Sequence, residues 1–298
     1  MKQFICSLLF ITTCLSFYAQ QQPCAVIVPP QISEETKKLY EQKLAEAKSK
    51  LTIDSNSAEN IIWYGRRTAY LGHYMEAIEI FSNGISKHPL NPRFLRHRGH
   101  RYITVRCFDK AIADLSKGAE MLKEQVDEIE QDGLPNARNL PTSTLKTNTL
   151  YHLGLAYFLK GDYKNALKAY NECLENSDTD DMYVATANWL YITMLRLGKK
   201  KDADDLLKTI NAEMDLIENR DYMDILMLYK SGDDKKLVEI TQTQDSTANA
   251  TLGFALGNYY LEKGPKKKAK ELFEKVVAGN QWASFGYIAA EAELKRMK

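Results

Sequence analysis

The sequence has almost no net charge and few cysteines. Its 40 basic and 39 acidic residues give a formal charge of +1, so the chain is not built for non-specific binding to nucleic acid or to an anionic membrane. With 44% hydrophobic residues and five cysteines in 298 positions, it fits neither a disordered nor a collagen-like chain. The length suffices for one or two ordinary domains or for one elongated array of repeats.

The sequence also lacks the short motifs of the common enzyme classes. It contains no nucleophile elbow, phosphate loop, dinucleotide fingerprint or paired-carboxylate motif. A metal site would have to use His97, His100 and His152, but no HExxH motif and no pair of cysteines at ligand spacing accompanies them. We therefore predict no catalytic residue, no cofactor and no metal.

The N-terminus has the features of an export signal. Lys2 precedes an apolar run from Phe4 to Phe17, which is too short to span a bilayer as a helix. We predict a signal peptide at residues 1–19, and hence a periplasmic or secreted protein without a transmembrane segment. The residues before Cys14 and Cys24 do not resemble a lipoprotein signal, so a lipid anchor is less favoured.

A pattern of helix-packing residues recurs along the chain, and residues 65–92 show it well: GRRTAYLGHYMEAIEIFSNGISKHPLNP. Gly65 precedes the turn residue Gly72, Ala77 and Phe81 follow that turn, and Pro89 closes the unit. The pattern resembles the tetratricopeptide repeat (TPR), a two-helix unit of about 34 residues. The resemblance implies an all-α, right-handed solenoid with a concave groove, and a recognition surface rather than a reaction vessel.

The turn residue sets the register of about six repeats within residues 58–298. They span about 58–91, 92–125 and 147–180, then two weaker units around Gly198 and Gly232, and a last one from about Ala250. Repeat three matches most completely. Repeat two has Arg106 at the turn position. A left-handed backbone costs more free energy for arginine than for glycine, but the rest of the repeat pattern is kept. Residues 20–57 are expected to be an extended leader and a capping helix from Ser33, and a second capping helix should cover Ala283 to Met297.

Three cysteines remain after signal removal, and we expect no full disulfide framework from an odd number. Cys107 follows the turn of repeat two, and Cys173 stands where a small residue packs in repeat three. Both are therefore predicted to be packed thiols.

One insertion interrupts the array, at residues 126–146 between repeats two and three. Asp132-Gly133, Pro135 and Pro141 predict a non-helical loop there. We expect this loop to fold back over the groove near repeats two and three. Asp132 and Asn136 would be lid residues, which either close on a ligand or occupy the site themselves.

The TPR resemblance implies that the first helix of each repeat lines the groove. The ligand-binding residues it predicts are Arg66, Tyr70, Arg96, His100, Tyr151 and Asn188. The helix starting at Pro92 places cations on nearly every side, so part of it must meet either a partner or acidic neighbours. Arginines at this spacing suit a carboxylate or phosphate, which resembles the carboxylate clamps of some TPR domains. The other interpretation is internal pairing with Asp109, Asp114, Asp127, Glu130 or Asp132.

These observations favour a non-catalytic scaffold in the cell envelope or secreted space. Its partner would be a protein or peptide segment, with an anionic group if the arginines bind it, and not nucleic acid. The alternative is a small-anion receptor or a hydrolase-like enzyme that uses the Arg/His cluster of repeats one to three under the 126–146 loop. The sequence does not determine the oligomeric state.

Overall fold

The computed structural model describes residues 23–131, 133–242 and 249–298. This part of the chain forms fourteen α-helices and no β-strand, which confirms the all-α prediction. None of these helices has the length and apolarity needed to cross a bilayer. The predicted signal peptide, residues 1–19, and the predicted lid residue Asp132 lie outside the described residues.

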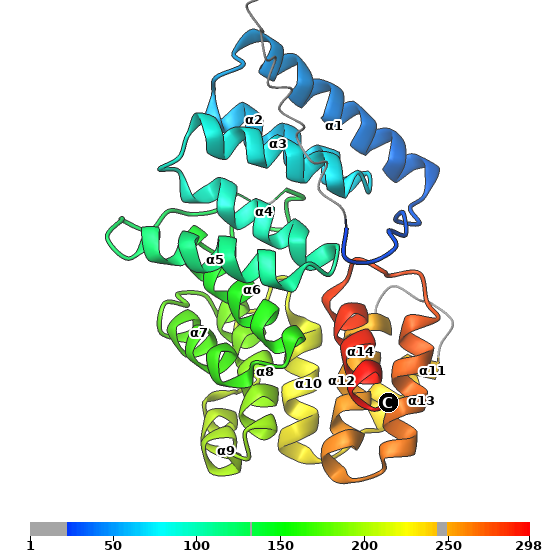
Figure 1. The fold of residues 1–298 in the computed structure, drawn as a ribbon. Helices are drawn as coiled ribbons and strands as arrows, with labels where there is room; N and C mark the ends of the chain where they lie inside the picture. Colours follow the sequence, from blue (N-terminus) through cyan, green and yellow to red (C-terminus); the bar gives the residue numbers. More distant parts are fainter. Residues whose placement is uncertain (1–22, 132, 243–248) are drawn as a thin grey trace, which may run out of the picture.

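Twelve of the helices form six helix-turn-helix pairs that follow one another along the chain (Figure 1). The pairs are α2 (Ala58–Tyr70) with α3 (Tyr74–Lys87), α4 (Pro92–Thr104) with α5 (Phe108–Leu122), α6 (Leu145–Lys160) with α7 (Tyr163–Glu175), α8 (Asp180–Arg196) with α9 (Lys200–Thr209), α10 (Arg220–Ser231) with α11 (Lys235–Gln242), and α12 (Asn249–Lys263) with α13 (Lys266–Val277). A helix stands at each end of the array: α1 (Glu34–Ile53), capped by the Ser33 side chain, packs on α2, and α14 (Phe285–Arg296) follows α13. The prediction of about six repeats with terminal helices is confirmed.

Each pair of helices is joined through a residue with a left-handed backbone. Five of these are the glycines of the repeat pattern, Gly72, Gly161, Gly198, Gly232 and Gly264, with φ between 70° and 112°. Arg106 adopts the same conformation in repeat two, with φ at 63°. The repeat register thus fixes this turn even where the residue bears a Cβ atom, at a modest conformational cost.

Glycine also lets the two helices of a repeat approach closely. A Cβ atom at Gly154 would lie 2.6 Å from the ring of Tyr170, and one at Gly65 would lie 2.5 Å from the ring of Phe81. Both rings are fully buried. The recurring combination of a small residue on the first helix and a large one on the second is therefore what packs each unit.

The array curves so that its last helices lie beside α6 and α8 (Figure 1). Helix α14 packs on α12 and α13, as a capping helix does, and also contacts α6. Arg106 Nε lies 2.8 Å from Glu291 Oε2 of α14, and its guanidinium also donates to the carbonyl of Trp282 at 2.8 Å. Arg296 donates to the carbonyls of Phe158 and Leu159. The C-terminus is thereby fastened to the turns of repeats two and three.

The leader is fastened to the array by a disulfide between Cys24 and Cys107. The prediction that Cys107 is a packed thiol is therefore wrong, because the extended leader runs back along the repeat turns. Cys24 N–H donates to the carbonyl of Val105 at 3.1 Å, and Pro30 lies against Gly72. Cys173 is a buried free thiol, as predicted, and burial raises its pKa to about 12.

Candidate functional site

Residues 126–144, which we call the strap, cross the concave side of the array. One part is held by repeat one. Arg66 Nη1 donates to the carbonyl of Gln131 at 2.9 Å, and Arg67 Nη1 donates to the carbonyl of Gly133 at 2.7 Å. Gly133 is needed at this point because a Cβ atom there would collide with the hydroxyl of Tyr70.

Another part of the strap is held by the segment between α9 and α10. Arg138 donates two hydrogen bonds of 2.6 Å to the carboxylate of Asp215, and the Thr142 hydroxyl donates to Glu218 at 2.9 Å. The strap therefore spans from repeat one to the junction of repeats four and five. We expected it over repeats two and three, and the observed span is wider.

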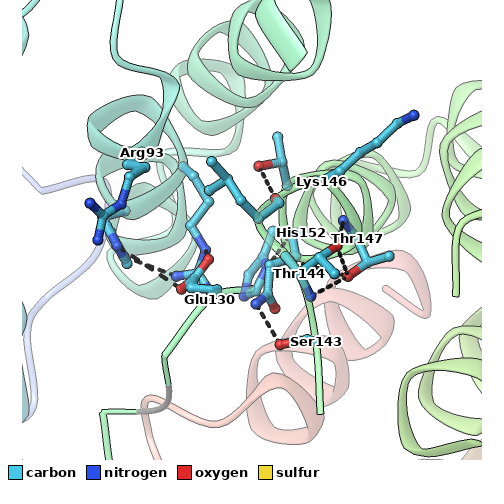
Figure 2. Close-up of polar contacts among 12 residues, drawn as sticks. Arg93, Glu130, Ser143, Thr144, Lys146, Thr147 and His152 are labelled. Atoms are coloured by element: carbon cyan, nitrogen blue, oxygen red, sulfur yellow. Dashed lines mark hydrogen bonds and ion pairs between the residues drawn. The ribbon is translucent and has the colours of Figure 1, made fainter. Parts of the chain in front are cut away.

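The base of the strap is ordered by local hydrogen bonds (Figure 2). Glu130 N–H donates to the carbonyl of Ser143 at 3.2 Å, and Leu145 N–H donates to the carbonyl of Glu128 at 2.8 Å. The predicted lid residue Asn136 donates to the carbonyl of Leu140 at 2.6 Å and accepts from the backbone N–H of Arg138. Its side chain thus shapes the tip of the strap.

Two cavities are lined by predicted groove residues, and the strap borders the larger of these two. The smaller cavity measures about 110 Å³ and brings together four predicted groove residues, Arg66, Tyr70, Arg96 and His100, with Ala69, Phe81, His97 and Arg101. The larger measures about 280 Å³, shares Arg66 and Arg96, and adds Glu130 and Gln131 of the strap, the predicted residue Tyr151, and His152, Glu218, Tyr222 and Phe285, among others. Five of the six predicted groove residues therefore line these cavities.

Asn188 is the predicted groove residue that lines neither cavity. It lies in the middle of α8, a helix whose residues are buried on nearly every side. Only 3% of Asn188 is exposed. The repeat position placed it in the groove, but α6, α7 and α10 pack around this helix.

Three arginines of α4 are paired internally, as one interpretation of the sequence held. Arg93 Nη1 lies 2.6 Å from Glu59 Oε2 of α2. Arg98 forms a bidentate pair with Asp114, with both nitrogen–oxygen distances at 2.7 Å. Arg96 Nε lies 2.9 Å from Glu130 Oε2 of the strap, and both side chains are buried. Internal pairing therefore accounts for much of the charge that α4 brings into the fold.

Arg101 behaves differently from these three arginines. Among the described residues no carboxylate lies within ion-pair distance of it, and its guanidinium stands over the ring of Tyr74 at 5.9 Å. Burial lowers its pKa to about 10, so the side chain is charged at neutral pH. Part of its accessible surface lines the smaller cavity. The cavity thus has a positive charge available to a ligand.

Comparisons with known proteins agree with this architecture. A family model described as tetratricopeptide repeat matches residues 147–180, which is repeat three as the sequence predicted it. These residues are therefore a tetratricopeptide repeat, and the described part of the chain has the fold of a TPR-like helical solenoid. Its fold is similar to the crystal structure of a tetratricopeptide repeat protein from Parabacteroides merdae, with a TM-score of 0.50 and 18% identity over 88% of this chain and 93% of that chain.

Two other TPR structures are similar to a lesser degree. YrrB, described as a TPR protein with an unusual peptide-binding site, gives a TM-score of 0.43 and 12% identity over 83% of this chain and 97% of that chain. TTC0263 of Thermus thermophilus gives a TM-score of 0.41 and 15% identity over 80% of this chain and 100% of that chain. No curated protein matches the chain in sequence.

Three histidines stand around these two cavities, and all three are held neutral. Burial is the main reason that the pKa values of His97, His100 and His152 lie well below the ordinary range, and neighbouring arginines lower them further. His152 Nδ1–H donates to the carbonyl of Asn148 at 2.6 Å, which fixes its tautomer. Within the described part of the chain, no three His, Cys, Asp or Glu side chains are grouped to hold a metal ion.

Phe285 is a lining residue that the repeat pattern could not reveal. Its ring lies 5.5 Å from the rings of both His100 and His152 and 6.3 Å from that of Tyr151. It comes from the start of α14, so the C-terminal helix supplies one wall of the groove. The TPR pattern assigns groove positions within each repeat and gives no signal for a residue that arrives from the far end of the chain.

Proposed function

We propose that this TPR protein is an exported, non-catalytic recognition protein that binds a segment of another protein in its concave groove. The ligand would present an anionic side chain to the smaller cavity. The observation that carries the proposal is Arg101, a half-buried cation whose accessible surface opens into that cavity and which meets no carboxylate among the described residues. Partial removal of a charge from water is costly unless an opposite charge accompanies it, so this site favours an incoming anion.

The size of the cavity favours a side chain over a whole small molecule. Its volume is about 110 Å³, whereas pockets for drug-sized ligands measure roughly 300–1,000 Å³. The adjoining cavity of about 280 Å³ has aromatic and hydrogen-bonding groups, Tyr151, Asn148 and Tyr222 among them, that suit a peptide backbone and a neighbouring side chain. Together they support recognition of an extended segment.

The disulfide supports export. Disulfides form and persist in oxidising compartments and are rare in the cytosol. Because Cys24 is paired with Cys107, its thiol is not available for a lipid anchor. These two points agree with the predicted signal peptide and favour a periplasmic or secreted protein that is released from the membrane.

The proposal predicts that Arg101→Gln weakens binding of acidic peptides. Random peptides displayed on phage would be selected on the immobilised mature protein, and their affinities measured by fluorescence anisotropy. Loss of a charged hydrogen bond corresponds to about 1.5–3 kcal/mol, so we expect affinity to fall roughly tenfold or more. The control is Lys208→Gln, which removes the same charge from a side chain that is 76% exposed on α9.

Three results would count against this function. Selected peptides that bind Arg101→Gln as tightly as the wild-type protein would place recognition elsewhere. Full competition by free acetate or phosphate at the concentration that saturates the site would favour the small-anion receptor instead. Equal loss of binding in Lys208→Gln would show that net charge, rather than the cavity, drives association.

A further inference from the structure

The strap already places a carboxylate among the groove arginines. The Glu130 side chain is 6% exposed, with Oε2 2.9 Å from Arg96 Nε and Oε1 4.0 Å from His97 Nε2. Figure 2 shows Glu130 reaching from the strap toward α4. Acidic side chains are rarely buried to this degree unless a cation accompanies them, so Arg96 is the reason that Glu130 points inward.

The backbone around Glu130 is bound in the same way as a foreign peptide would be. Ile129 forms an isolated antiparallel bridge with Thr144, and the carbonyl of Gln131 accepts from Arg66 at 2.9 Å. The carbonyl of Gly133 accepts from Arg67 at 2.7 Å. Repeats one and two thus hold an acidic segment of the strap through one carboxylate and two backbone carbonyls.

Two other ion pairs of the strap lie at the surface. Arg138 and Asp215 pair at the surface, with 47% and 68% of their side chains exposed, and Arg93 lies 3.6 Å from Glu128, which is 54% exposed. Exposed ion pairs of this kind contribute little to stability. The contact of Glu130 with Arg96 is therefore the main electrostatic attachment of this part of the strap.

We infer that residues 128–131 are an internal stand-in for the ligand, and that the ligand is an extended acidic segment whose carboxylate displaces Glu130 from Arg96. This inference rests on the proposed function and names the ligand class and the regulation of the same groove. A ligand with a second carboxylate reaches Arg101 as well, which the stand-in, through Glu130, does not. That additional ion pair gives the external segment its advantage over the internal one.

The test uses the fluorescein-labelled peptide VDEIEQ, the sequence of residues 126–131. In the wild-type protein the strap competes with this peptide at the high effective concentration of a tethered group. Glu130→Gln keeps the shape of the side chain and removes its charge, so we expect the peptide to bind this variant at least tenfold more tightly than the wild type. Glu124→Gln, an exposed carboxylate outside the strap, is the matched control and should bind like the wild type. The peptide VDEIQQ should lose this affinity.

The outcomes separate this inference from the proposed function. Equal affinity of VDEIEQ for the wild type and for folded Glu130→Gln would overturn the inference that residues 128–131 stand in for the ligand. So would binding of VDEIQQ to Glu130→Gln as tight as that of VDEIEQ. In both cases the proposed function would survive if phage-selected peptides still bind. Absence of any selected peptide would instead refute the proposed function. If circular dichroism shows Glu130→Gln to be unfolded, Glu130→Asp takes its place, because its shorter side chain moves the carboxylate away from Arg96. Tighter binding of VDEIEQ than in the wild type is expected there as well, and its absence would overturn the inference.

Discussion

Replacing both Cys24 and Cys107 with serine should lower the free energy of unfolding of the mature protein by about 4 kcal/mol. Their disulfide links residues 83 positions apart, and in the chain-entropy account a cross-link over roughly this distance restricts the unfolded chain by about 4–5 kcal/mol. The bond also holds the leader against the turns of repeats one and two. Urea unfolding followed by circular dichroism measures the change.

Reduction of the wild-type protein is the matched control for this double variant. Both should unfold at the same urea concentration, because the reduced protein lacks the same cross-link and keeps every other contact. The buried thiol of Cys173 is left intact in both. An unfolding midpoint that does not respond to reductant would contradict the disulfide and weaken the argument for export.

Acidification from pH 6.5 to 5.5 should cost the folded state about 3 kcal/mol. Burial, aided by neighbouring arginines, holds the pKa values of His97, His100 and His152 well below the ordinary range. The unfolded chain therefore takes up protons near pH 6.5 while the folded chain does not, so stability is complete above pH 6.5 and falls below it. Each such histidine is half protonated in the unfolded chain at pH 6.5 and almost fully protonated at pH 5.5, so it contributes about 1 kcal/mol over this interval.

Urea unfolding at a series of pH values measures this loss. His152→Phe should remove about a third of the pH dependence, because one of the three protons is no longer taken up on unfolding. The control His73→Gln changes an exposed residue before α3 that makes no capping hydrogen bond, and it should keep the full dependence. Uptake of less than one proton on unfolding between pH 6.5 and 5.5 would contradict the neutral, buried state of these histidines.

The repeat architecture could be predicted because its signals are local. The spacing of Gly72, Ala77 and Phe81 recurs within each unit, and the same spacing assigned residues 147–180 to the repeat that the family model also matches. Even Arg106 could be placed at a turn, since the flanking residues set the register. Its role in binding α14 could not be foreseen, because Glu291 lies 185 positions away along the chain.

The site was predicted less completely, because several acidic residues could pair with the arginines and they lie far from them along the chain. Arg66, Arg96 and His100 were assigned to the groove by their places in the repeat, and the structure brings them to one cavity. The sequence offered five acidic residues as partners for the arginines and no means to choose, because the choice depends on where the strap crosses. Glu130 pairs with Arg96, and Asp114 pairs with Arg98. Arg101 has no such carboxylate partner among the described residues, and its position in the repeat did not predict that it would be the arginine available to a ligand.

A crystal structure of the mature protein with a phage-selected acidic peptide tests the central claim most directly. We predict that a peptide carboxylate lies within hydrogen-bond distance of Arg101, that another takes the place of Glu130 at Arg96, and that residues 128–131 have left the groove. A peptide bound on the outer helices, with Glu130 still paired to Arg96, would contradict the account.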